Sequence, residues 1–186
     1  MKLFYYFNFS IIKQIYSIVS KMSNYLKEFE FKSSPKSLTY LDGEPLKLTE
    51  KFDFFHNKNK LRKGLNQLQY LFKSYINNPL LASGIRDSYL SEEYTEKYLI
   101  VLFTTPEIVQ NSNEILTIYS DIKFSQGNFV LVSTQDYILL LAEDMEGINL
   151  GVEILEEILN QVLEDYFNKK NFEDFIKIRQ FRLSNF

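Results

Sequence analysis

The second half of the chain alternates short apolar runs with one long amphipathic run. Residues 98–103, 128–132 and 137–142 are strongly apolar and are bounded by turn-forming residues, which predicts strands. Residues 148–167 instead repeat apolar side chains every three or four positions, as expected of a helix with one buried face. A further strand is expected at 115–124, so that three consecutive strands form an antiparallel meander.

The first half carries weaker versions of the same patterns. Residues 26–32 alternate apolar and charged side chains, which predicts a half-buried strand. Short strands are expected at 38–41 and 46–49, and this front part could be a small antiparallel meander. Residues 59–76 have helical periodicity, and the tail, residues 172–186, alternates loosely enough for a last strand.

Together these elements predict an α+β fold: a single two-layer domain with a mostly antiparallel sheet covered by two main amphipathic helices. The chain has 186 residues, enough for one self-sufficient core. Its hydrophobic content of 45% and charged content of 24% are ordinary for a globular protein. No break in composition marks a second domain, and we expect residues 22–186 to form one.

Residues 1–21 form an apolar N-terminal segment for which the sequence leaves three alternatives. Its uninterrupted part is about ten residues, whereas a membrane-spanning helix needs ~20. The segment can be an export signal, a helix packed on the domain or at an interface, or a stretch that is not translated because Met22 begins a plausible protein. We expect no membrane contact unless residues 1–21 are retained.

The absence of cysteine and the mild net charge exclude several classes of function. Without Cys the chain has no disulfide, thiolate metal site, iron–sulfur cluster or cysteine nucleophile. This absence fits a reducing compartment, and we expect a cytoplasmic protein. A net charge of −3 argues against a general nucleic-acid binder, which is usually strongly basic. The chain also lacks glycine-rich phosphate loops and the common serine and zinc hydrolase motifs, so we expect no cofactor.

A basic cluster is the sharpest local charge feature. It surrounds the start of the 59–76 helix, where the helix dipole makes positive charge unfavourable. Free backbone N–H groups at a helix start can hold a phosphate or another anion, although a solvated lysine-rich surface explains the cluster equally without a ligand. Its members are His56, Lys58, Lys60, Arg62 and Lys63.

His56 is the only histidine of the chain. Its intrinsic pKa suits a general base, but no spacing in the sequence supplies a partner carboxylate. One histidine also cannot build a multi-histidine metal site. The sequence therefore favours a surface or loop histidine.

Acidic residues gather before and along the 148–167 helix. Glu143, Asp144 and Glu146 precede it, and they suit either a magnesium site or the cap of a helix N-terminus. Four more lie on its outer side and form either a solvated face or a docking surface for a basic partner or a second copy. They are Glu153, Glu156, Glu157 and Glu164.

The oppositely charged helical faces, together with the lack of catalytic motifs, favour a binding or assembly module over an enzyme. Such a module would act through contacts with a protein partner or with a second copy of the chain. The alternative is a small phosphate- or anion-binding protein or enzyme that uses the basic cluster at residues 56–63.

Overall fold

Over the residues that it describes, the computed structural model contains a mixed sheet, a small two-stranded sheet, two α-helices and a short 3-10 turn. It describes residues 26–48, 53–56, 59–71, 83–84, 98–103, 119, 121–168 and 176–186. The strands are β1 (Ser37–Tyr40), β2 (Leu46–Leu48), β3 (Asp53–His56), β4 (Ser83–Gly84), β5 (Tyr98–Phe103), β6 (Phe129–Ser133), β7 (Tyr137–Ala142), β8 (Ile176–Ile178) and β9 (Phe181–Ser184). The helices are α2 (Arg62–Leu71), preceded by the turn η2 (Asn59–Leu61), and α5 (Met145–Asn168).

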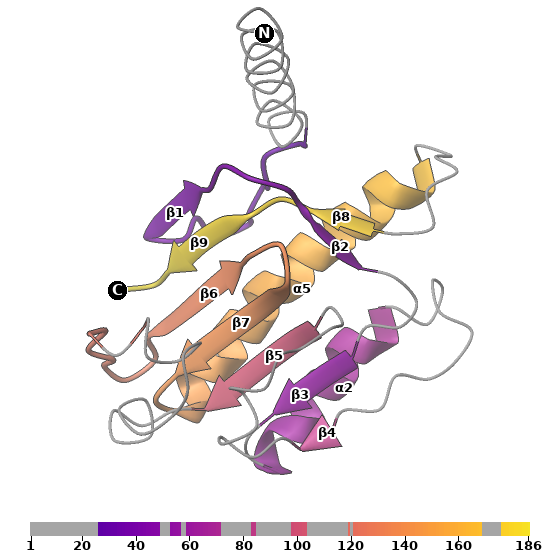
Figure 1. Ribbon diagram of the computed structural model, residues 1–186. Coiled ribbons are helices and arrows are strands. Elements are labelled where there is room, and N and C mark those ends of the chain that lie inside the picture. Colours follow the sequence, from indigo (N-terminus) through magenta and orange to yellow (C-terminus); the bar gives the residue numbers. More distant parts are fainter. Residues whose placement is uncertain are drawn as a thin grey trace, which may run out of the picture.

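The main sheet has an antiparallel half and a parallel half (Figure 1). Its seven strands follow the order β1-β9-β6-β7-β5-β3-β4. From β1 to β7 neighbouring strands are antiparallel, whereas β7, β5, β3 and β4 run parallel to one another. A second sheet pairs β2 with β8, also antiparallel. The α+β fold class is therefore confirmed.

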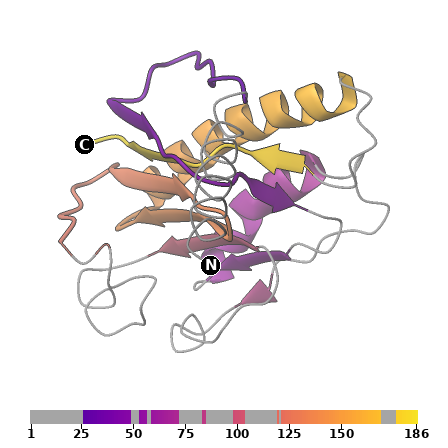
Figure 2. The same ribbon diagram turned by 45° about the horizontal axis from the view of Figure 1, so that its top comes forward.

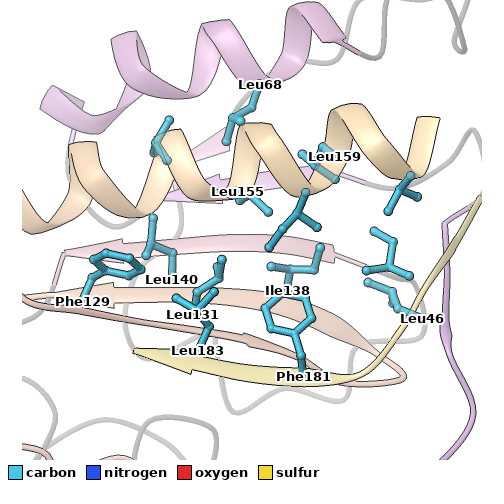
Figure 3. Close-up of a cluster of buried hydrophobic side chains, with 14 of the residues drawn as sticks. Leu46, Leu68, Phe129, Leu131, Ile138, Leu140, Leu155, Leu159, Phe181 and Leu183 are labelled. Carbon is cyan, nitrogen blue, oxygen red and sulfur yellow. The ribbon is translucent and has the colours of Figure 1, made fainter. Parts of the chain in front are cut away.

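Helix α5 is the main cover of the sheet, and α2 lies beside it (Figure 1). α5 packs on β6, β7 and β8, while α2 contacts β3 and α5. In Figure 3, Leu155 and Leu159 of α5 lie over Ile138 and Leu140 of β7, and Leu68 of α2 packs on the far side of α5. All five side chains are fully buried or nearly so, and each such burial contributes roughly 1.5–3 kcal/mol.

Two glycines allow α5 to approach the sheet closely. A Cβ atom at Gly147 would collide with the backbone oxygen of Asn128, and one at Gly151 would collide with the side chain of Leu140. The glycines are four positions apart and so lie on one face of the helix. Glycine inside a helix costs about 1 kcal/mol relative to alanine. The close packing of α5 on the sheet offsets that cost, because a larger residue at either position would displace its neighbour.

The front of the described chain pairs with its tail in two successive antiparallel ladders, β1 with β9 in the main sheet and β2 with β8 in the second sheet. Between the two ladders, residues 41–45 lie opposite Arg179 and Gln180. Gly43 has a φ of 139° there, a conformation that favours glycine. The Nε2 group of Gln180 donates a hydrogen bond to the backbone oxygen of Glu44, at 2.6 Å.

Several expected elements are present. The helix expected at 148–167 is α5, and the described part of the expected 59–76 helix is η2 and α2. The apolar runs 98–103, 128–132 and 137–142 are β5, β6 and β7. The loosely alternating tail supplies both β8 and β9, and the two short front strands are β1 and β2.

Two local expectations are wrong. Residues 26–32 are described and contain no strand. Residues 119 and 121–124 also contain none, and the rest of the strand expected at 115–124 lies outside the described residues. The front segments also form no meander of their own, because β1 pairs with β9 and β2 with β8. Alternation in a sequence reports which side chains are buried, but it does not identify the pairing partner.

Some expectations concern residues that the structure does not describe. The N-terminal segment, residues 1–21, lies outside the described residues, so its three alternatives stay predictions. Among the described residues, no helix combines the length and the apolarity needed to cross a bilayer. The assignment of residues 22–186 to one domain also stays a prediction.

Candidate functional site

The basic cluster begins at the end of a parallel strand. His56 is the last residue of β3, in register with Gly84 of β4 and Val101 of β5. Its side chain is only 2% exposed, so the expectation of a surface or loop histidine is wrong. Burial of His56 could not be predicted from the sequence, because β3 has four residues, too few to establish a periodic pattern.

The cations of the cluster belong to the segment that follows His56. Lys60, in η2, has an exposed side chain, and Arg62 is the first residue of α2. The side chains of Arg62 and Lys63, and the whole of Lys58, lie outside the described residues. The backbone nevertheless brings the start of a helix to the carboxyl end of a parallel strand, where open α/β sheets bind ligands. Anion binding by the cluster stays a prediction.

The expected acidic face of α5 divides into an exposed part and an engaged part. Glu153 and Glu164 are exposed, and about three helical turns separate them, so they project from the same side. Among the described residues, no salt bridge reaches either carboxylate. We call these two residues the acidic stripe.

The other two glutamates make contacts within the molecule. Glu156 is half-buried, and its Oε2 atom accepts a hydrogen bond from Nε2 of Gln67 on α2, at 2.6 Å. Glu157 is also half-buried, and its Oε2 atom accepts a hydrogen bond from the backbone N–H of Lys32, at 3.2 Å. Both residues therefore join α5 to neighbouring segments.

Asp144 caps the N-terminus of α5. Its Oδ1 atom accepts a hydrogen bond from the N–H of Gly147 at 2.7 Å, and its Oδ2 atom accepts one from the N–H of Gly127 at 2.9 Å. The bond from Gly147, reinforced by that from Gly127, holds the pKa of Asp144 below its ordinary value. The capping interpretation is confirmed. Across the described ranges, no group of three or more His, Cys, Asp or Glu side chains is arranged to hold a metal ion.

A pair of tyrosines, of which Tyr119 is buried and Tyr137 half-buried, lies where the sequence pattern indicated no site. The hydroxyl of Tyr137 forms a hydrogen bond with that of Tyr119, and the guanidinium carbon of Arg182 lies 5.9 Å from the centre of the Tyr119 ring. Burial raises the pKa of both hydroxyls above 10. Both groups therefore stay protonated at neutral pH, so this pair links two segments and does not supply a base.

Residues 26–32 form an extended segment, which we call the strap. Its central backbone is bound by a single side chain of α5, Gln161. The N–H of Glu30 donates a hydrogen bond to Oε1 of Gln161 at 2.9 Å, and Nε2 of Gln161 donates one to the oxygen of Glu30 at 2.7 Å. The side-chain amide therefore takes the place of a neighbouring strand.

Two further side chains bind the strap from the side of the sheet. The N–H of Phe29 donates a hydrogen bond to the hydroxyl of Tyr40 at 2.7 Å, and Arg179 donates one to the oxygen of Leu26 at 3.4 Å. The Arg179 guanidinium also stacks 4.1 Å from the centre of the Tyr40 ring. Sequence reasoning missed these residues because a glutamine, a tyrosine and an arginine carry no signal until the fold brings them together.

The comparisons with known proteins give a fold and no family. No protein-family model and no curated protein matches the chain. Among solved structures, CpGH84D matches 87% of this chain over 24% of its own length, with a TM-score of 0.57 and 12% identity. An inactive mutant of a Vibrio harveyi GH20 exo-β-N-acetylglucosaminidase matches 82% of this chain over 18% of its own, with a TM-score of 0.50 and 10% identity. At such identities the likeness shows the fold alone, and this chain spans less than a quarter of either protein.

Proposed function

We propose that the chain is a cytoplasmic binding or assembly module that acts through protein–protein contacts, not an enzyme. The observation that carries this proposal is the acidic stripe, Glu153 and Glu164, on a helix that contains no Lys or Arg. A surface with charge of one sign attracts a partner of the opposite sign and sets the orientation of docking. The partner is a protein with a basic surface, or a second copy of the chain that presents residues 58–63.

Charge reversal tests the proposal. We expect a tagged chain to retain a stoichiometric partner, or a second copy, in native mass spectra of a pull-down from lysate. Glu153→Lys combined with Glu164→Lys should abolish that complex, because repulsion replaces attraction at the stripe. The matched control is Asp121→Lys, at an exposed carboxylate outside α5, and this variant should keep the complex.

Salt gives an independent readout of the same contact. A charge-guided contact between exposed groups weakens as the Debye length falls from about 10 Å at 0.1 M salt to about 3 Å at 1 M. We therefore expect the complex to dissociate over this range. A complex that persists both in 1 M salt and after the charge reversal would contradict docking through the acidic stripe.

The alternative function is binding of a phosphate or another anion by the basic cluster. The position of His56 and the start of α2 at the carboxyl end of parallel strand β3 favours it. Inorganic phosphate should then raise the melting temperature of the chain, and Arg62→Glu should abolish the shift while the circular dichroism spectrum is unchanged. If no phosphate compound raises the melting temperature, the alternative is excluded.

A further inference from the structure

The strap is bound through its backbone in the way that an extended peptide is bound in a groove. Successive N–H groups of an extended chain point to opposite sides. Accordingly, the N–H of Phe29 points to Tyr40, while those of Glu30 and Lys32 both point to α5. Every one of these partners is a side chain, so the strap belongs to no ladder of either sheet.

Two aromatic side chains of the strap supply its apolar contacts. Phe29 and Phe31 are half-buried and pack against the core cluster. The Phe29 ring lies 5.5 Å from the ring of Phe181 in an edge-to-face arrangement, and 6.0 Å from the ring of Tyr40. Such aromatic pairs contribute beyond their buried area.

The charged side chains of the strap are exposed, whereas Leu26 is half-buried. Glu28 lies 3.9 Å from the guanidinium of Arg179. Lys27 and Glu30 form a salt bridge at 3.2 Å with both side chains well exposed, and surface pairs of this kind contribute little. Recognition therefore uses the backbone and two aromatic residues in the pattern Phe-x-Phe.

We propose that the groove that holds the strap, lined by Tyr40, Glu157, Gln161 and Phe181, is a peptide-binding surface that can take the strap of a second copy of this chain. The proposed occupant is residues 26–32 of another copy, because the side chains that bind this segment are the same in every copy of the chain. Exchange of an identical element is a low-cost route to a dimer.

The attachment of the strap permits this exchange. Release breaks hydrogen bonds to individual side chains and leaves every ladder of the main sheet in place. Residues 33–36, which connect the strap to β1, are mostly exposed, and Figure 2 shows the indigo strap leaving α5 and turning into β1. A short connection gives the chain's own strap an effective concentration on the order of millimolar, so the intact chain fills its own groove at low concentration.

A complementation experiment with two full-length variants tests exchange between copies. The first variant, Phe29→Ala with Phe31→Ala, keeps the groove and loses the aromatic anchors of the strap. The second, Gln161→Ala, keeps the strap and loses the side chain that binds its backbone. Native mass spectrometry of the mixture should show a one-to-one complex of the two variants, whereas neither variant alone should dimerise.

A peptide-binding experiment tests the groove separately from the exchange of straps between copies. The probe is a fluorescein-labelled peptide of residues 26–33, acetylated and amidated so that its ends carry no charge. It should bind the first variant, and adding Gln161→Ala to that variant should weaken binding roughly fivefold, as expected for the loss of two hydrogen bonds to the backbone of Glu30. A control peptide with alanine at positions 29 and 31 should not bind.

Each negative result overturns a stated part of the proposal. If the peptide binds but the two variants form no complex, the second copy is not the occupant. If the peptide does not bind, or binds regardless of Gln161, the groove is not a peptide site. Should the double alanine variant fail to fold, Glu30→Pro replaces it, because proline removes the N–H that Gln161 binds while both aromatics stay.

This exchange uses other side chains than the docking proposed for the acidic stripe, although Glu157 and Gln161 lie on the same side of α5 as Glu153 and Glu164. Among the described residues, no hydrogen bond or salt bridge joins Glu153 or Glu164 to the strap, so reversal of these two glutamates should leave the mixed complex in place. The two proposals can therefore fail independently.

Discussion

Strand β6 and the strap are both extended segments that cover the same core, but they are held in different ways. β6 forms ladders with β7 on one side and β9 on the other, and all five of its residues are buried. The strap forms no ladder, and its hydrogen bonds go to side chains such as Tyr40 and Gln161. A ladder binds many backbone groups together, whereas side-chain contacts can be lost one at a time.

The difference has a consequence for local stability. Segments with many exposed residues and few buried contacts open at lower free energy than the central strands of a sheet. We therefore expect the strap to detach while β6 and β7 stay paired. A part of the fold that opens separately is also a part that can be exchanged.

The largest expected effect comes from the core under α5. Leu140→Ala removes a fully buried side chain on β7 and should lower the free energy of unfolding by about 2–5 kcal/mol. Urea unfolding measures this change. Phe29→Ala in the strap should cost less, because its side chain is only half-buried. A greater loss of stability for Phe29→Ala than for Leu140→Ala would contradict the expectation that the strap contributes less than the core under α5.

The two glycines of α5 should differ in their tolerance of a methyl group. Gly147→Ala places its Cβ against the backbone oxygen of Asn128, which cannot rotate away, and should cost about 1–3 kcal/mol. Gly151→Ala meets the end of the Leu140 side chain and should cost less, because a side chain can shift its position where a backbone oxygen cannot. Thermal unfolding of the two variants compares them directly. Equal costs would show that the rigidity of the neighbour is not the deciding factor.

The cap of α5 should give a smaller effect that depends on pH. Asp144→Ala should lower stability by about 1 kcal/mol, because the N-terminal N–H groups lose their acceptor. Asp144→Asn keeps a side-chain oxygen as acceptor but removes the negative charge, so comparison with the wild type measures the contribution of the charge. Because the folded-state pKa of Asp144 lies below its ordinary value of 3.8, the charge stabilises the fold above that pH.

The advantage of the wild type over Asp144→Asn should therefore be largest near neutral pH. It should disappear as the pH falls through the folded-state pKa, below 3.8. Denaturant unfolding between pH 7 and roughly pH 2 measures the difference, a range that spans the reference carboxylate pKa values. A difference that grows in acid would mean that the carboxylate is not bound in its charged form.

The smallest effect on global stability is expected in the strap. Gln161→Ala removes two hydrogen bonds to the backbone of Glu30, and about 1 kcal/mol lost locally should speed amide exchange at Glu30 roughly fivefold. The amides of β6 and β7 should exchange at unchanged rates. Hydrogen-exchange mass spectrometry resolves the two regions. Parallel acceleration in both would show that the strap and the sheet open together.

Much of the secondary structure could be predicted from local pattern, because a period of two or of 3.6 residues is fixed by backbone geometry. This held for β7 and for α5, where long runs bury one face or both. It failed at β3, where four residues are too few to reveal a period. It failed differently at the strap, where the alternation correctly indicates half-burial although no strand lies beside it.

The candidate sites were less predictable than the fold. Composition marked the basic cluster and the acidic helix, but only the structure separated Glu153 and Glu164, which face solvent, from Glu156 and Glu157, which bind within the molecule. The role of Gln161 had no sequence signal at all. A polar side chain becomes a binding group only when folding places it opposite an unpaired backbone.

The α+β class, the main helix and the apolar strands follow from local patterns in the sequence, since they depend on short-range periodicity and on the need to bury apolar area. Three features required the folded chain: the pairing of the tail with β1, the burial of His56, and the position of the strap against α5. The reason is that partners far apart in the sequence are chosen by packing and by backbone hydrogen-bond satisfaction, which no local pattern encodes.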